Sequence, residues 1–269
     1  MSFSDGIVDC HVHVFDQKQP LAERRRYAPD YDALPENLLD LMDRSGVTKA
    51  VLVQPSFLGT NNTYLVDAIK NHPGRFVGVA VVDVDTHPSK LLALKNAGVK
   101  GVRLNCLGKD APDFSCGVYA DLADKVAEIG LHIEIQAEGE QWTTVAQGLS
   151  RPRCTIVVDH FGRTTAGTPG FLDLMAMAQD SDKIWFKFSA PYRFAGAAAC
   201  AALIAGKIGL DRVVWGSDWP WTQSEGRHRY GETLNWLTTF VSDVKARQAI
   251  LVDNASTLYS LGEQSVYHG

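Results

Sequence analysis

The sequence predicts an α/β fold in which eight parallel strands, each followed by a helix, close into one distorted (β/α)8 TIM barrel. Short apolar, β-branched segments alternate with longer helical patterns, and one strand–helix unit recurs about every 25–30 residues. The strands are largely continuous apolar runs, as expected for strands that are covered on both faces. No glycine-rich phosphate motif follows the first strand, which argues against the rival prediction of an open, doubly wound sheet.

Taken in order along the chain, eight segments have the character of strands. They are Ile7–Val14, Lys49–Gln54, Phe76–Val82, Gly101–Leu104, His132–Gln136, Thr155–Val158, Ile184–Phe188 and Arg212–Trp215. The helical segments that separate or follow them are Asn37–Ser45, Tyr64–Asn71, Ser89–Ala97, Tyr119–Ile129, Phe171–Gln179, Ala195–Ile208 and Leu234–Leu251. Gly46, Gly98 and Gly130 directly follow three of these helices, and each suits the left-handed residue that ends a helix.

The bulk composition is that of one globular domain. An α/β barrel of about 250 residues forms a single domain, so we assign residues 1–269 to one barrel, with residues 262–269 as a flexible tail. The net charge of −5 lacks the basic excess of a nucleic-acid-binding protein. The longest apolar run, Phe194–Gly206, is shorter than the about 20 residues that cross a bilayer. We therefore expect a small-molecule partner and neither nucleic acid nor membrane.

The cysteines and the first residues indicate the compartment. The five cysteines are widely spaced and form no CxxC pair, which disfavours both a disulfide framework and a cysteine-based metal site. The first residues, MSFSDGIVDC, lack the basic and then apolar pattern of a secretion signal. Reduced thiols and a cytoplasmic location are the expectation, and the oligomeric state is left open.

Polar side chains collect where the predicted strands end. In a barrel of this kind, the carboxyl ends of the strands line the active site. His11 and His13 are two residues apart on one strand, so both imidazoles point to the same side. The other candidates at strand ends are Ser56, Arg103, Gln136, His160, Arg163, Arg193 and Asp218. Each has an ordinary structural interpretation when taken alone, but structural residues would be scattered over both ends of the barrel. Their convergence on one rim favours a functional site.

A family resemblance rests on these same residues. Asp9, His11 and His13 form a DxHxH pattern, His160 lies in VVDHFGR, and Asp218 lies in WGSDWP. With these motifs in this order, the chain resembles the amidohydrolase superfamily. RRYAPDYDA, VLVQPSFLGTNN, GVRLN and SAPYR make it most similar to the branch around 2-pyrone-4,6-dicarboxylate lactonase. The resemblance implies an amidohydrolase-type barrel and a lactone hydrolase of aromatic-compound catabolism.

Two residues depart from that pattern. The resemblance places Gln136 where the lactonase has a substrate-binding tyrosine, and Lys109 where it has a further arginine. Binuclear members of the superfamily also bridge two metals with a carboxylated lysine in the middle of the barrel, and here the end of the fifth strand offers Gln136 and no lysine. The exact lactone is therefore left open.

Two mechanisms can use the same four residues. In the first, favoured by the lactonase resemblance, no cofactor is needed: Asp218 is the general base on water, and His11, His13 and His160 stabilise the carbonyl oxygen. In the second, the four side chains bind one divalent metal, zinc or manganese, which activates the water. In either case a carboxylated substrate would be held by Arg103, Arg163 and Arg193, with Tyr27, Ser56, Lys109 and Gln136 also in contact.

Other functions fit the same scaffold. A mononuclear zinc-dependent decarboxylase would bind the metal and release carbon dioxide. A lactone isomerase would move a double bond or ring bond without taking up water. A binding protein without catalytic activity would require the four central residues to be structural, since a shared fold does not prove activity.

Overall fold

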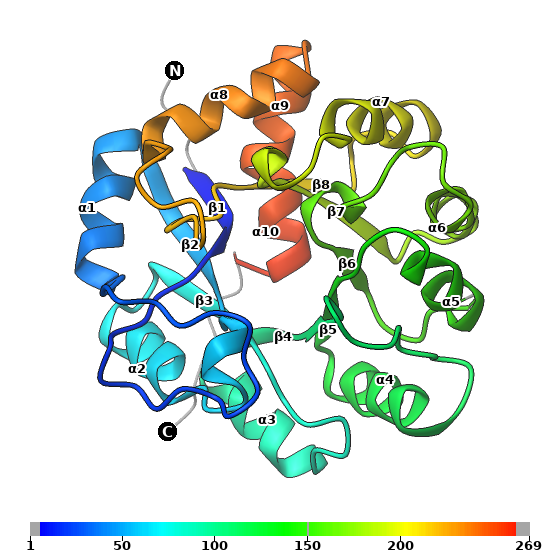
Figure 1. The fold of residues 1–269 in the computed structure, drawn as a ribbon. Coiled ribbons are helices and arrows are strands. Elements are labelled where there is room, and N and C mark those ends of the chain that lie inside the picture. Colours follow the sequence, from blue (N-terminus) through cyan, green and yellow to red (C-terminus); the bar gives the residue numbers. More distant parts are fainter. Residues whose placement is uncertain (1–5, 150, 262–269) are drawn as a thin grey trace.

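The strands form a barrel, as predicted, with most of the helices outside the ring and the last helix across one end of it (Figure 1). The structure is a computed structural model that describes residues 6–149 and 151–261, so the predicted tail, residues 262–269, lies outside the described residues. The eight strands are parallel and follow chain order around the sheet. They are β1 (Ile7–Val12), β2 (Val47–Val53), β3 (Phe76–Ala80), β4 (Val99–Asn105), β5 (His132–Gln136), β6 (Ile156–Val158), β7 (Ile184–Ser189) and β8 (Val213–Gly216).

Backbone hydrogen bonds close the barrel between β1 and β8. The Asp218 N–H donates to the His11 carbonyl at 2.9 Å, and the His13 N–H donates to the Trp219 carbonyl at 2.8 Å. A side chain at Gly216 would not fit here, because its Cβ would lie 2.6 Å from the Cβ of His11. Closure of the barrel therefore places His11, His13 and Asp218 side by side.

Ten helices surround the described part of the barrel. They are α1 (Pro35–Ser45), α2 (Thr63–Asn71), α3 (Pro88–Asn96), α4 (Gly117–Ile129), α5 (Gln141–Gly148), α6 (Pro169–Asp180), α7 (Ala197–Lys207), α8 (Tyr230–Phe240), α9 (Val244–Leu251) and α10 (Asp253–Tyr259). Short 3-10 turns cover Ser56–Leu58, His160–Gly162 and Pro191–Arg193. Gly46 and Gly130 end α1 and α4 with φ of 72°, as the helix-stop pattern predicts.

The helix predictions differ from the structure in three places, one of which is α10, since the last predicted helix ends at Leu251. The prediction of one helix over Leu234–Leu251 is wrong: α8 ends at Phe240, Val241 is extended, and the Asp243 carboxylate starts α9 by accepting from the Ala246 N–H at 2.7 Å. Helix α5 was not predicted, because its stretch is short and contains two threonines and a final glycine.

The apolar core has an outer and an inner part. The outer part lies between the strands and the helices and includes Phe15, Leu38 and Phe186, all fully buried. The inner part fills the barrel at the amino ends of the strands, where Val8 and Val51 pack with Tyr259 of α10. No helix in residues 6–149 and 151–261 is long and apolar enough to cross a membrane. Apolar side chains thus fill the amino end of the barrel, and the polar side chains lie at the opposite, carboxyl end.

Candidate active site

A cavity of about 290 Å³ opens at the carboxyl ends of the strands. Its walls include nine of the residues predicted from sequence: His13, Tyr27, Ser56, Arg103, Gln136, His160, Arg163, Arg193 and Asp218. His11 is fully buried directly beneath the cavity, and Lys109 is exposed outside its wall. A larger hollow, of about 1130 Å³, opens among residues at the amino ends of strands, such as Val99 and His132, and contains none of the predicted site residues. Active sites in this fold lie at the carboxyl end, so the smaller cavity is the candidate.

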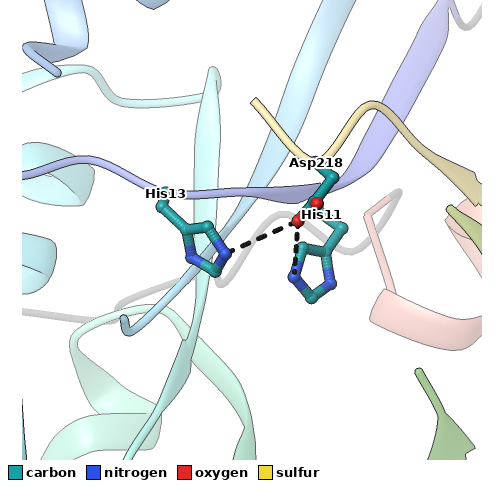
Figure 2. Close-up of side chains that lie close together, drawn as sticks. All are labelled: His11, His13 and Asp218. Carbon is teal, nitrogen blue, oxygen red and sulfur yellow. Dashed lines mark ion pairs between the residues drawn. The ribbon is translucent and has the colours of Figure 1, made fainter. Parts of the chain in front are cut away.

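His11, His13 and Asp218 meet at one point at the base of the cavity (Figure 2). The Asp218 Oδ1 lies 3.7 Å from the His11 Nε2 and 3.8 Å from the His13 Nε2. Among the described residues, neither Asp218 Oδ1 nor His11 Nε2 has a hydrogen-bond partner. A buried polar atom without a partner is costly, so these atoms are arranged for a ligand that fits between them.

Two residues that line the cavity have unusual backbone conformations. Asp218 and His160 have φ of 61° and 51°, in the left-handed region that residues other than glycine seldom adopt. Such conformations cost of order 1–3 kcal/mol each and collect at functional sites. Their occurrence at the two strand ends that carry Asp218 and His160 supports a functional role for this rim.

Asp9 of the DxHxH motif has a different role from the histidines. Its carboxylate accepts hydrogen bonds from the backbone N–H of His11, the backbone N–H of Ser217 and the hydroxyl of Tyr230, at 2.8–3.1 Å. Asp9 is fully buried and does not line the cavity. It therefore ties β1 to the end of β8 and fixes the histidines relative to Asp218.

The second oxygen of Asp218 is held by two neighbours. The Arg193 Nε and the Tyr192 hydroxyl donate to Oδ2 at 2.6 Å and 2.5 Å. Burial alone would raise the pKa of Asp218, but the Arg193 guanidinium and the nearby imidazoles outweigh burial and hold that pKa well below its ordinary value. Asp218 is therefore a carboxylate at neutral pH, with Oδ1 free to accept a proton.

The three histidines are neutral at pH 7. Burial lowers the pKa of His13 to about 4 and that of His160 to about 3, and it also lowers the pKa of His11. The His13 Nδ1 lies 2.7 Å from the Val53 carbonyl, and the His160 Nδ1 lies 2.8 Å from the Ser189 hydroxyl. Neutral imidazoles can each donate one hydrogen bond and accept another.

A buried charge network, which we define as Arg103, Glu134, Asp159 and Lys187, lies beneath the histidines. The Lys187 Nζ lies 2.6 Å from Glu134 Oε2 and 3.3 Å from Asp159 Oδ1. The Arg103 Nη2 lies 2.9 Å from Asp159 Oδ2 and also donates to Gln136 Oε1 at 2.8 Å. Burial raises the pKa of Asp159 less than the two cations lower it, so Asp159 is ionised. The network joins β4, β5 and β7 across the interior of the barrel.

The remaining predicted binding residues form the upper wall of the cavity. The Arg163 Nε pairs with Glu138 at 3.3 Å, and its side chain is 23% exposed, so it can reorient toward a ligand. The Tyr27 hydroxyl donates to Glu225 Oε1 at 2.5 Å, which links the loop after β1 to the loop after β8. The cavity mouth is thus formed by two loops that contact each other.

Three residues at the site were missed from the sequence. Lys187 was counted as part of an apolar strand, although a lysine between Phe186 and Phe188 was a signal that it needed buried acidic partners. Arg26 lines the cavity mouth but is not among the predicted site residues. Tyr192, which donates to Asp218, is not among them either.

The comparisons with known proteins agree with this geometry. The family model described as amidohydrolase matches residues 8–261. A 2-pyrone-4,6-dicarboxylate hydrolase from Comamonas testosteroni is 30% identical over 94% of this chain and 90% of its own length. A 4-sulfomuconolactone hydrolase from Rhizobium radiobacter is 29% identical over 95% of this chain and 90% of its own length. The crystal structure of a probable 2-pyrone-4,6-dicarboxylic acid hydrolase from Acinetobacter baumannii, with citric acid bound, superimposes with a TM-score of 0.88 at 30% identity, over 94% of this chain and 99% of that chain.

Proposed function

The chain belongs to the amidohydrolase family, and from that premise we propose that it opens a carboxylated lactone similar to 2-pyrone-4,6-dicarboxylate by hydrolysis. The relatives with lactone hydrolase names support the reaction class. The observation that carries the proposal is the unpartnered Oδ1 of Asp218, which faces two imidazoles at the base of an arginine-rich cavity. That arrangement suits a carboxylate that removes a proton from water beside a polarised carbonyl group.

The proposed reaction is one addition followed by one elimination. The water oxygen forms a bond to the lactone carbonyl carbon while one water proton passes to Asp218. An imidazole N–H group that points into the site, assigned to His160, stabilises with the cationic wall the negative charge that develops on the carbonyl oxygen. The ring C–O bond then breaks, and the ring oxygen leaves with the proton returned by Asp218. The product is an open-chain acid with one new carboxyl group.

Substrate recognition is assigned to the cationic wall of the cavity. Arg163 can meet a carboxylate with two parallel hydrogen bonds. Arg193, which donates to Asp218 and Thr222, adds positive charge to the wall, and Arg103 adds a third guanidinium at the base. Tyr27 and Ser56 supply neutral donors at the mouth, and Gln136, held by Arg103, faces the ring of the substrate. The names of the relatives specify a dicarboxylate and a sulfonate, and both are anions of the kind that this wall would bind. Lys109 is exposed, so the proposal gives it no contact.

A divalent metal is also compatible with these residues. One nitrogen from each of His11 and His13 and one oxygen of Asp218 lie within 4.8 Å of one another, which fits the donor set that zinc prefers, and His160 could be a fourth ligand. Such an ion would lower the pKa of a bound water to about 7.

We nevertheless propose a metal-independent site, because two cations already contact the residues that would bind the ion. Arg103, Lys187 and Arg193 pair with the carboxyl groups of Asp159, Glu134 and Asp218 in turn, and the imidazoles are neutral. Burial raises the pKa of Glu134 to about 8, and the fourth buried carboxyl group, that of Asp9, accepts only from neutral donors. A dication would add two positive charges beside Lys187 and Arg193, which lie in contact with His11 and Asp218. An activated lactone also needs less help from the nucleophile than an amide or a simple ester does.

The experiment is a turnover assay on a panel of lactones with and without carboxylates. We expect loss of the ultraviolet absorbance of 2-pyrone-4,6-dicarboxylate, incorporation of one oxygen atom from ¹⁸O-labelled water, and no measurable turnover of an uncharged lactone. Asp218→Asn should keep the fold and bind substrate but lose kcat by orders of magnitude. Full turnover by Asp218→Asn would contradict the general-base role. Release of carbon dioxide would indicate the decarboxylase, and product formation without ¹⁸O uptake would indicate the isomerase.

A further inference from the structure

Lys187 has no exposed surface and three polar neighbours. Its Nζ lies 2.6 Å from Glu134 Oε2, 3.1 Å from His11 Nδ1 and 3.3 Å from Asp159 Oδ1. An ammonium group has three hydrogens to donate and no lone pair with which to accept. The contact with His11 is therefore a hydrogen bond that Lys187 donates, and the two carboxylate contacts are ion pairs.

This contact decides which nitrogen of His11 carries its hydrogen. Because Lys187 can only donate, Nδ1 of His11 must accept, and the hydrogen of the neutral ring is on Nε2. The carboxylate oxygens of Asp159 and Glu134 lie farther from Nδ1, at 3.4 Å and 3.5 Å. The Nε2–H group of His11 points toward Asp218 Oδ1, the atom without a partner.

His13 has the opposite arrangement. Its Nδ1 lies 2.7 Å from the carbonyl oxygen of Val53, which can only accept a hydrogen bond. The hydrogen of neutral His13 is therefore on Nδ1, and its Nε2 directs a lone pair toward Asp218 Oδ1, 3.8 Å away. The point between the three side chains thus has one donor, His11 Nε2–H, and two acceptors, His13 Nε2 and Asp218 Oδ1.

We propose that Lys187 is a positioning residue that fixes His11 and His13 as opposite tautomers around the water that Asp218 activates. A water oxygen fits this point because it donates one hydrogen to Asp218 and one to His13 while accepting from His11. Its fourth tetrahedral direction, a lone pair, is left for the carbonyl carbon of the substrate. A carbonyl oxygen fits the point poorly, because it would face two acceptors with nothing to donate. This inference rests on the proposed hydrolysis and assigns the carbonyl oxygen to His160 and the cationic wall of the cavity.

The same contact disfavours a metal at His11. A histidine that binds a metal through Nε2 carries its hydrogen on Nδ1 and donates it to a carboxylate or carbonyl group. In the wild-type protein Lys187 donates into that nitrogen instead. Without Lys187, Asp159 and Glu134 are the nearest acceptors, and His11 would change to the tautomer that can bind a metal.

The test measures the tautomers directly, in protein labelled with ¹⁵N-histidine at neutral pH and without substrate. Two-bond and three-bond ¹⁵N–¹H correlations distinguish Nδ1–H from Nε2–H, and a His11→Gln spectrum assigns the ring. We expect His11 as Nε2–H and His13 as Nδ1–H in the wild type. In Lys187→Met we expect His11 to change to Nδ1–H while His13 stays the same. Glu134→Gln is the matched control, because it keeps Lys187 against His11 and should leave both tautomers unchanged.

Zinc titration by calorimetry and steady-state kinetics provide the second readout. Lys187→Met should bind zinc at least about tenfold more tightly than the wild type, and its kcat should fall far more than its KM changes. If Lys187→Met does not fold, the double variant Lys187→Met/Glu134→Gln is used in its place in all three measurements. The double variant removes both members of the ion pair and therefore leaves no unpaired buried charge there. His11 as Nδ1–H in the wild type would overturn the inference even if lactone turnover is normal. Absence of lactone turnover with the expected tautomers would instead overturn the proposed function alone.

Discussion

Replacing Arg193 with methionine tests how the site controls the basicity of Asp218. Arg193 donates to Asp218 Oδ2 at 2.6 Å, and its side chain is only 14% exposed, so solvent screens this contact little. Methionine keeps most of the apolar length of arginine but has no charge and no N–H group. Tyr192 still donates to the same oxygen, so Asp218 keeps one of its two partners.

The size of the effect follows from the contact that is lost. A hydrogen bond to a charged group contributes about 1.5–3 kcal/mol. One pKa unit corresponds to about 1.4 kcal/mol, so the pKa of Asp218 should rise by about 1–2 units. Because protonated Asp218 cannot accept a proton from water, activity is lost as pH falls through that pKa. Besides burial, Arg193 also lowers the pKa values of His13 and His160, which lie at about 4 and 3, so these imidazoles are protonated before Asp218 as pH falls. The acid limb of the kcat/KM profile should therefore move to higher pH in Arg193→Met, by no more than about 1–2 units, and reports all three groups.

The assay follows loss of lactone absorbance across a pH series for three enzymes. Arg163→Met is the control, because Arg163 pairs with Glu138 and not with Asp218. The substrate carboxylates titrate in the same way with all three enzymes. A difference between the kcat/KM profiles therefore reports a change in the pKa values of the free enzyme. Coincident acid limbs for the wild type and Arg193→Met would refute the inference that Arg193 lowers the pKa values of Asp218, His13 and His160. An equal shift in Arg163→Met would show that general loss of positive charge, and not the contact, is responsible.

Three further predictions concern binding and stability. Arg163→Met should raise KM for a carboxylated lactone by about 5–150-fold, the equivalent of 1–3 kcal/mol, with little change in kcat; an unchanged KM would remove Arg163 from the site. Gly216→Ala should displace His11, because the new Cβ would lie 2.6 Å from the Cβ of His11. The free energy of unfolding, measured in urea, should fall by about 1–3 kcal/mol, and stability equal to wild type would contradict that close contact. Burial lowers the pKa of His132 to about 3, so below its ordinary value of 6.5 the unfolded chain takes up a proton that the folded chain does not, and stability falls as pH drops. In His132→Leu, the free energy of unfolding should fall by about 2 kcal/mol less between neutral pH and pH 5 than it does in the wild type. If the variant and the wild type show the same pH dependence of unfolding, His132 is not a buried neutral imidazole.

Which side chains lie together at the carboxyl end of the barrel could be predicted from the sequence, because the strand order alone decides it. Parallel strands in chain order bring their carboxyl ends together, so polar residues at those ends converge whatever their distance in sequence. The two-residue spacing of His11 and His13 placed both imidazoles on one side, and both point to Asp218. Closure between β1 and β8 then brought the first and last strands together, as a barrel requires.

The inner contacts could not be predicted, because they depend on partners and on side-chain direction. Lys187 is separated along the chain from Glu134 and Asp159, and only the closed barrel shows that their charges meet beside His11. Asp9 belongs to the DxHxH pattern, yet its carboxylate faces backbone N–H groups rather than the cavity. Lys109 lies on a loop after β4, where neither strand parity nor helix period fixes the direction of a side chain.

The break between α8 and α9 has a local cause that the periodicity concealed. Apolar residues continue at helical spacing from Leu234 to Leu251, so the pattern alone indicates one helix. The Asp243 carboxylate competes for the backbone by capping Ala246, and the chain turns at Val241. A capping residue inside a periodic stretch is the signal that would have divided it.

The central claim is that the side chains of the site catalyse hydrolysis without a bound metal. The decisive measurement is turnover of 2-pyrone-4,6-dicarboxylate by protein that has been treated with a strong chelator, with its metal content determined by mass spectrometry. The account predicts that kcat and KM of the metal-free protein equal those of the untreated protein, and that added zinc or manganese does not increase them. Turnover that is lost with the metal and restored by either ion would contradict it, and would make His11, His13, His160 and Asp218 ligands instead of a water-binding site.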